Sequence, residues 1–189
     1  MVSLGYVLGR QSESLGNKIM SSTAIDKAPI PLVKPDGSYE VVPLEKDEIV
    51  IKVIQSGVKN LTDFPSIEDG LQHNIAHMKK LGERACSQGD KADILLFHEF
   101  PLTGYNPGAR EEKLKFTIKV PGPETEALGA LARKCDSYVI FGSYATDDNW
   151  PGHILSLNTV LGRDGSVVKT FWKSRNIKHL YEDREITTT

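Results

Sequence analysis

The sequence has few of the features that mark membrane, secreted or nucleic-acid-binding proteins. Only two cysteines, Cys86 and Cys135, occur among 189 residues, too few for a disulfide framework. No apolar run approaches the roughly 20 residues that span a bilayer, and residues 1–20 lack the pattern of a signal peptide. The 23 basic residues form no block or stripe, so neither a membrane nor a nucleic-acid partner is expected. We therefore expect a cytoplasmic protein with free thiols.

The composition is that of an ordinary globular protein, 39% hydrophobic and 25% charged, and the length suits one domain with a core. Residues 1–47 are weakly patterned and rich in glycine and proline. We expect them to form an N-terminal extension or arm, which is either mobile or packed on a partner subunit. From residue 48 onward the pattern is regular, so residues 48–189 are expected to form the folded domain.

Hydrophobic patterning within residues 48–189 predicts strands that alternate with helices. Ser66, with Asp69 three residues later, predicts the N-terminal cap of a first helix. Pro123 suits the first position of a second helix. The turn signal at residues 163–166 predicts an antiparallel pair, so the fold class is α/β with a mixed β-sheet and helices on one face. The expected strands are residues 48–55, 92–97, 138–144, 156–161 and 167–172.

Two charged residues follow strands in a way that suits chemistry. Glu99 comes just after the apolar run 92–97, and Pro101 then turns the chain. Lys173 ends another strand directly after two aromatic residues. If both strands end at the same edge of one sheet, the carboxylate and the ammonium form a polar site. The alternatives are that Glu99 is a solvated loop residue and that Lys173 is a surface lysine.

The histidines and cysteines do not form a convincing site of their own. His73 and His77 are four residues apart on the first predicted helix, but no third ligand accompanies them. Solvated helix residues are therefore expected, and no metal. Cys86 and Cys135 both fall on predicted helices, where they are expected to be small packing residues.

Several short motifs occur in a fixed order along the domain. They are FPLTGY directly after Glu99, PGPET at 121–125, VIFGSY at 139–144, LNTVLGRDG at 157–165 and FWK at 171–173. In this order they resemble the nitrilase, or carbon–nitrogen hydrolase, superfamily, and the resemblance covers roughly residues 48–189. It implies an α-β-β-α sandwich, usually doubled across a dimer interface, with an amidase-like activity.

The resemblance also implies roles for individual residues. Glu99 matches the general base of the family, and Lys173 matches the lysine that stabilises the oxyanion. The second glutamate of the family follows that lysine, so Glu182 is expected to fill this role, with Glu185 as the alternative. Tyr105 is expected at the base of the substrate pocket. His98 stands where the family usually has proline, and we interpret it as a tolerated substitution.

The implied reaction needs a third residue, a nucleophilic cysteine, and no metal or organic cofactor. In the family this cysteine lies on a strand beyond the lysine, whereas Cys86 and Cys135 both precede Lys173. The sequence ends at Thr189. We therefore expect an incomplete sandwich, the N-terminal part of the domain with the C-terminal part absent. Such a chain would be a fragment or subunit of a hydrolase that cleaves non-peptide carbon–nitrogen bonds through a cysteine thioester, inactive alone.

Two other interpretations stay open. The chain could be a non-catalytic, nitrilase-like binding or scaffold subunit, or an unrelated α/β domain. The expected partners are a small-molecule amide or nitrile and either further copies of the chain, in a homo-oligomer, or a complementing C-terminal chain. The sequence does not separate amidase, nitrilase and carbamoylase activities, although an amide is the favoured substrate.

Overall fold

The computed structural model describes residues 46–57, 59–106 and 109–173. By its contacts the chain divides into one unit of residues 1–6 and 50–189 and a second unit of residues 7–49. All helices and strands of the described residues belong to the first unit. Of the second unit only residues 46–49 are described, and they form neither helix nor strand. The predicted arm, residues 1–47, thus lies almost wholly outside the described residues.

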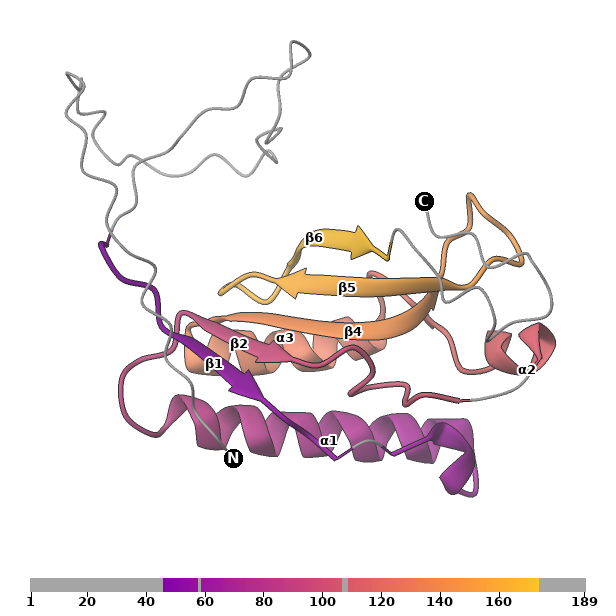
Figure 1. The fold of residues 1–189 in the computed structure, drawn as a ribbon, viewed down its shortest axis with the longest axis horizontal. Helices are drawn as coiled ribbons and strands as arrows, with labels where there is room; N and C mark the ends of the chain where they lie inside the picture. Colours follow the sequence, from indigo (N-terminus) through magenta and orange to yellow (C-terminus); the bar gives the residue numbers. More distant parts are fainter. Residues whose placement is uncertain (1–45, 58, 107–108, 174–189) are drawn as a thin grey trace, which may run out of the picture. The chain divides into compact units, whose positions relative to one another are not determined.

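A mixed sheet forms the centre of the described unit (Figure 1). Its strands follow the order β1-β2-β4-β5-β6, with β3 paired to β4 off this path. The pairs among β1, β2 and β4 are parallel, and β5 is antiparallel to β4 and to β6. The antiparallel pair of β5 and β6 is the one that the turn signal predicts. The strands are β1 (Ile51–Ile54), β2 (Ile94–Phe97), β3 (Ile118–Lys119), β4 (Tyr138–Thr146), β5 (Leu155–Leu161) and β6 (Val167–Trp172).

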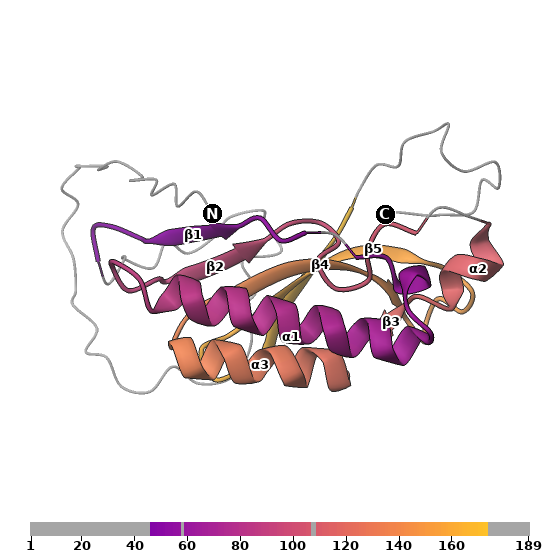
Figure 2. The ribbon, with the colours of Figure 1, turned by 90° about the horizontal axis from the view of Figure 1, so that it is seen from below.

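Two long helices, α1 (Ile67–Cys86) and α3 (Pro123–Cys135), cover the same face of this sheet (Figure 2). The predicted cap of α1 is confirmed, because Ser66 Oγ accepts the Asp69 N–H at 3.1 Å. Apolar side chains from helices and strands meet in one core, which includes Met78, Leu95, Leu128 and Phe141. One sheet with helices on one face corresponds to half of an α-β-β-α arrangement.

Two short elements, α2 (Arg110–Leu114) and β3, occupy the stretch between β2 and α3. The sequence pattern predicts no helix or strand here. The run from Arg110 to Leu114 is too short and too polar to show a periodic apolar face. A 3₁₀ turn, η1 (Leu61–Asp63), likewise precedes α1.

Two ionisable residues of the sheet are buried and bonded. Lys52 on β1 donates from Nζ to the carbonyl oxygens of Ala85, at 2.8 Å, and Gln88, and so satisfies the C-terminal end of α1. Asp93, just before β2, accepts the Val50 N–H at 3.0 Å and pairs with Arg163 Nη2 at 2.8 Å. Both residues therefore hold neighbouring elements together rather than facing a site.

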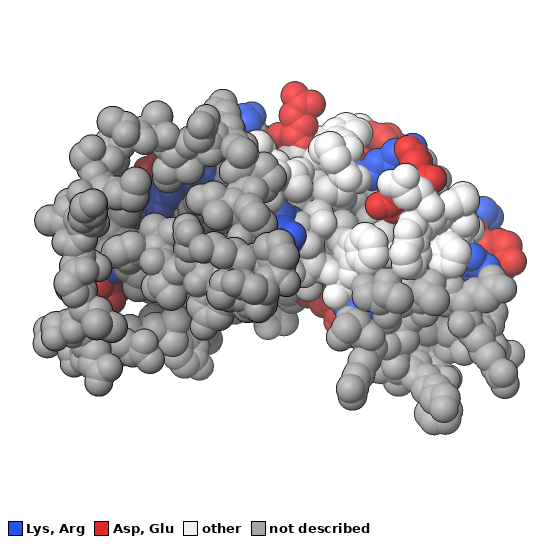
Figure 3. Space-filling view, turned by 90° about the horizontal axis from the view of Figure 1, so that it is seen from above, with Lys and Arg blue, Asp and Glu red and all other residues white. Residues whose placement is uncertain are grey.

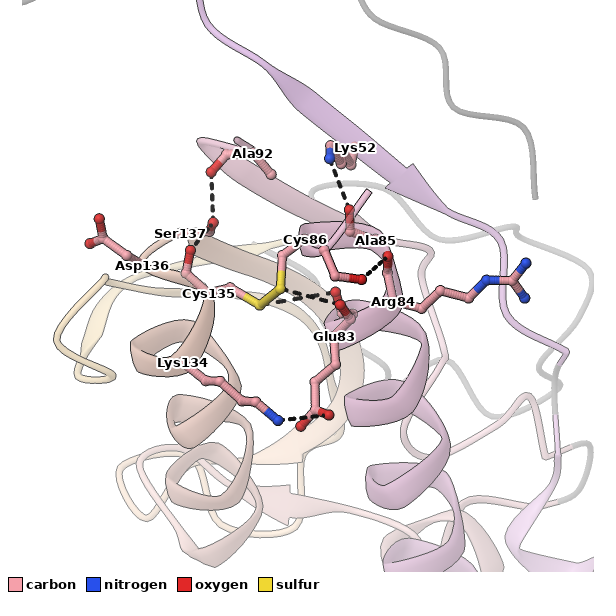
Figure 4. Close-up of a disulfide and its surroundings, with 12 residues drawn as sticks. Lys52, Glu83, Arg84, Ala85, Cys86, Ala92, Lys134, Cys135, Asp136 and Ser137 are labelled. Atoms are coloured by element: carbon pink, nitrogen blue, oxygen red, sulfur yellow. Dashed lines mark hydrogen bonds and ion pairs between the residues drawn. A yellow bond between two sulfur atoms is a disulfide. The ribbon is translucent and has the colours of Figure 1, made fainter. Parts of the chain in front are cut away.

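The two cysteines are joined in a disulfide, so the prediction of free thiols is wrong for this structure (Figure 4). Cys86 is the last residue of α1 and Cys135 the last residue of α3. Because these helices lie side by side and end together, the two Cα atoms come within 5.8 Å, inside the range that a disulfide spans. The alignment of two helix ends is a tertiary feature that the spacing of cysteines does not show.

The surface of the described part carries charges of both signs. On the face shown in Figure 3, basic and acidic side chains are interspersed along the margin of an uncharged area. Within residues 46–57, 59–106 and 109–173, no helix combines the length and the apolar character that crossing a membrane requires.

Candidate active site

Glu99 lies just beyond the end of β2, where the backbone of β4 presses against it. The Gly142 N–H donates to the His98 carbonyl at 3.2 Å. A Cβ atom built on Gly142 would lie 2.0 Å from the Glu99 carbonyl oxygen and 2.8 Å from its Cα. No side chain fits in that space, so the glycine allows β4 to fix the backbone at Glu99.

Lys173 lies directly after β6, the last strand in the order of the sheet, and its side chain reaches Glu99. Its backbone N–H donates to the Ser156 carbonyl of β5 at 3.0 Å, which fixes the chain as it leaves β6. Its Nζ atom lies 2.7 Å from Glu99 Oε1, and the two side chains are 38% and 46% exposed. Ser156 Oγ donates to the same carboxylate oxygen over a longer distance, 3.4 Å. The two charged residues selected from the sequence are thus brought into direct contact.

A carboxylate and an ammonium in this arrangement can serve an acyl-transfer reaction. The carboxylate can accept a proton from a nucleophile or from water. The ammonium can stabilise negative charge that develops on a carbonyl oxygen. Neither group is sealed from solvent, so a substrate can approach both.

An aromatic cluster lies beside this pair. The Phe100 ring packs on Tyr144 of β4 at 4.5 Å between centroids and on Tyr105 at 5.8 Å. Tyr105, the predicted substrate-binding residue, is 37% exposed. Lys113 of α2 is almost fully buried, with its Nζ atom 5.5 Å from the ring centroids of both tyrosines. Lys113 and Tyr144 carry no signal in the sequence, because neither their spacing nor their neighbours mark them.

His98, directly before Glu99, forms a hydrogen bond at each of its two ring nitrogens. Its Nε2 atom lies 2.6 Å from Ser56 Oγ, beyond the end of β1, and its Nδ1 accepts the Phe100 N–H at 3.3 Å. Burial lowers the pKa of the imidazole, and an interaction with the backbone of Ser56 opposes this shift. In the sequence His98 looks like a tolerated substitution, but its hydrogen bonds link the segment after β1 to the segment that carries Glu99.

The structure does not bring the two cysteines to this site, and it does not describe the predicted second glutamate. Glu182 and its alternative Glu185 lie outside the described residues. Cys86 and Cys135 end their helices beside the starts of β2 and β4, where Ser137 Oγ donates to the Ala92 carbonyl at 2.6 Å (Figure 4). Glu99 follows the opposite end of β2, and a four-residue strand is about 13 Å long. Across residues 46–57, 59–106 and 109–173, no group of three or more His, Cys, Asp or Glu could hold a metal ion.

The sequence matches a family model described as "Carbon-nitrogen hydrolase" over residues 67–187. Among curated proteins, the omega-amidase NIT2 of Danio rerio is 29% identical over 100 residues, which cover 53% of this chain and 34% of that protein. The protein N-terminal amidase of Saccharomyces cerevisiae is 43% identical over 60 residues, covering 31% and 13% of the two chains. The matches thus span about a third or less of these relatives.

Solved structures share the fold. A crystal structure of an N-terminal amidase superposes with a TM-score of 0.56 at 24% identity, covering 68% of this chain and 28% of that one. A carbon–nitrogen hydrolase from Helicobacter pylori G27 gives a TM-score of 0.56 at 20% identity, covering 74% and 44%. The predicted α/β fold class with a mixed sheet is thereby confirmed.

Proposed function

Because the chain belongs to the carbon–nitrogen hydrolase family, we propose that it supplies the general base and the oxyanion-stabilising lysine of an amidase-type hydrolase. The observation that carries this proposal is the 2.7 Å contact between Glu99 Oε1 and Lys173 Nζ. The names of the two curated relatives, an omega-amidase and an N-terminal amidase, support an amide as the substrate class. Residues 48–189 then form the N-terminal part of the hydrolase domain.

The proposed reaction proceeds through a thioester. Glu99 takes the proton of a cysteine thiol, and the sulfur forms a bond to the amide carbon while Lys173 stabilises the oxyanion. The carbon–nitrogen bond then breaks, and the proton passes from Glu99 to the departing ammonia or amine. Glu99 next takes a proton from water, whose oxygen attacks the thioester carbon. The carbon–sulfur bond then breaks, the acid leaves, and the proton passes from Glu99 to the sulfur to restore the thiol. Glu182, or alternatively Glu185, is proposed to hold Lys173 in place.

We propose that the nucleophilic cysteine comes from outside these 189 residues, either from a further segment or from a complementing chain. Two observations support this. Cys86 and Cys135 are bonded to each other, and both lie beside the starts of the strands, whereas Glu99 follows the end of β2. Neither sulfur is therefore placed to give its proton to Glu99.

We further propose that Tyr105 lines the pocket for a small-molecule amide. It is exposed, and it contacts the Phe100 ring that directly follows the proposed base. The finer choice between an amide and a nitrile rests on the names of the relatives rather than on this geometry. A homo-oligomer and a cytoplasmic location also stay predictions.

The alternative is a non-catalytic binding or scaffold subunit, and one observation favours it: among the described residues no cysteine lies beside Glu99. Intact-mass measurement of the full-length protein, with any complementing chain and an amide substrate, distinguishes the two. The proposal predicts a mass increase equal to the acyl group, located on a cysteine other than Cys86 and Cys135. A protein that releases no ammonia and gains no mass with any amide or nitrile would support the alternative.

A further inference from the structure

His98 is the residue that departs from the family motif. Its hydrogen bonds involve backbone groups directly before and directly after Glu99 in the chain. The His98 carbonyl accepts the Gly142 N–H at 3.2 Å, just before Glu99. The His98 ring accepts the N–H of Phe100 at 3.3 Å, just after Glu99. The same ring lies 2.6 Å from the hydroxyl of Ser56, which is buried. One residue therefore joins β1, β4 and the segment after Glu99.

The bond to Phe100 determines the form of the imidazole. A backbone N–H can only donate, so Nδ1 must carry a lone pair, and the neutral ring must hold its proton on Nε2. Nε2–H then donates to Ser56 Oγ. A doubly protonated ring would have no acceptor for the Phe100 N–H, and the turn after Glu99 would lose its side-chain anchor.

We propose that neutral His98 is a positioning residue that holds the Glu99 carboxylate against Lys173. The catalytic consequence of this role rests on the proposed function, but the geometry does not. The Glu99 side chain is half exposed and is held at its tip by Lys173 and, more weakly, by Ser156. The backbone that aims it is fixed by Gly142 on one side and by the His98 ring on the other. Loss of the ring bond therefore loosens the base without removing it.

Protonation of His98 is the event that would break this arrangement. Burial is the larger cause of the lowered pKa of His98. The neutral ring, which the hydrogen bonds require, is therefore the form present at neutral pH. Three segments contribute the neighbouring charged and titratable groups. They are Tyr144 on β4, whose ring packs on Phe100, and Glu99, which is paired with Lys173 beyond β6.

Three substitutions distinguish the hydrogen bonds of the ring. In His98→Asn the amide oxygen takes the place of Nδ1 and can still accept the Phe100 N–H. In His98→Ala both ring bonds are lost. Ser56→Ala removes the bond at Nε2 alone. In the full-length enzyme we expect His98→Ala to lower kcat about tenfold or more with little change in KM, since small displacements of a catalytic group are costly. His98→Asn should recover most of that loss.

The pH profile supplies a readout that a merely structural role would not move. In the wild-type enzyme kcat/KM should fall as pH drops through the pKa of His98. In His98→Asn the fall should move to lower pH, because the group that titrates in the wild type is gone. An unchanged acid limb in His98→Asn, or a kcat as low as that of His98→Ala, would overturn the proposal.

An NMR measurement tests the positioning without any activity. Selective ¹⁵N-phenylalanine labelling gives one amide signal for each of the 6 phenylalanines in this sequence, and Phe100→Tyr identifies that of Phe100. The Phe100 signal should shift as His98 titrates and should stop doing so in His98→Asn. A Phe100 signal that ignores the titration of His98 refutes the inference even in an active enzyme. Conversely, if the wild type hydrolyses no amide, the proposed function fails, and the Phe100 signal still decides the positioning.

Discussion

The Nζ atom of Lys173 lies 2.7 Å from Oε1 of Glu99, although the two residues are 74 positions apart in the chain. Glu99 follows β2 and Lys173 follows β6, with β4 and β5 between them in the sheet. Small residues on the intervening strands flank the pair: Gly142 lies against the Glu99 backbone and Ser156 bonds to Lys173. These positions leave room for two long side chains to meet.

Lys173→Met should abolish amide hydrolysis while leaving the protein folded. Removing one oxyanion-stabilising group typically costs about 100-fold or more in kcat. The pair is more than a third exposed, so its loss should change the free energy of unfolding by less than about 1 kcal/mol. Ammonia release and thermal denaturation measure the two effects separately.

The matched control is Lys119→Met, which removes an exposed ion pair with Asp148, 2.8 Å long, at the end of β3. It should be as stable as Lys173→Met and as active as wild type. Equal activity in the two variants would show that Lys173 has no role in the reaction.

Gly142→Ala should displace Glu99. The added methyl would meet the Glu99 carbonyl oxygen at 2.0 Å, and this atom belongs to the backbone, which cannot rotate away. Overpacking of this kind costs about 1–3 kcal/mol, so we expect Tm to fall by several degrees. At a temperature where the variant is still folded, kcat should also be lower than that of the wild type, because Glu99 is displaced.

Gly57→Ala is the control for this change, because no atom lies within 4 Å of a Cβ added there. Its Tm and activity should match the wild type. The close approach of β4 to Glu99 would be disproved if Gly142→Ala behaved in the same way.

Reduction of the Cys86–Cys135 disulfide should destabilise the protein. The cysteines are 49 positions apart, and the chain-entropy model gives about 4 kcal/mol for a loop of that length. Tm should fall when a reductant is added to the wild type, and a variant with serine at both positions should not respond. Two freely alkylated thiols in protein purified without reductant would contradict the disulfide and favour the free thiols expected of a cytoplasmic protein.

The stability of the fold should depend on His98 below about pH 6.5. Because burial lowers the pKa of this ring in the folded state, the unfolded chain binds its proton first as pH falls from that value. The stabilising contribution of His98 is therefore complete above pH 6.5 and declines toward acid.

Urea denaturation of wild type and His98→Asn between pH 7.5 and 5 measures this difference. The stability advantage of the wild type should shrink as pH falls, by at most about 1.4 kcal/mol per pH unit. His73→Asn, at an exposed position of α1, controls for the loss of an imidazole. A difference that stays constant with pH would show that His98 does not titrate as described.

The strands and long helices were predictable from the sequence because local patterning defines them. The cap at Ser66, the proline at the start of α3 and the turn between β5 and β6 all lie where the residues indicate. The boundaries differ by a few residues, as for β1, which is shorter than predicted. Local sequence also placed Glu99 and Lys173 at the ends of strands.

Other features depend on contacts between distant segments and leave no local signal. The disulfide requires that two helices end together, and the burial of Lys113 depends on aromatic rings from β4 and from the segment after β2. The bonds of His98 involve Ser56, which is 42 positions away. A residue that looks like a tolerated substitution in the motif thus acquires contacts that only the fold provides.

The central claim is that this chain supplies the general base of an amide hydrolase. Glu99→Gln tests it most directly, because glutamine keeps the size of the side chain and an oxygen for Lys173 but cannot take up the proton. In the full-length enzyme, with any complementing chain, we predict that kcat/KM for amide hydrolysis falls about 100-fold or more with Tm nearly unchanged. A Glu99→Gln enzyme that hydrolyses amides as fast as the wild type would contradict the account.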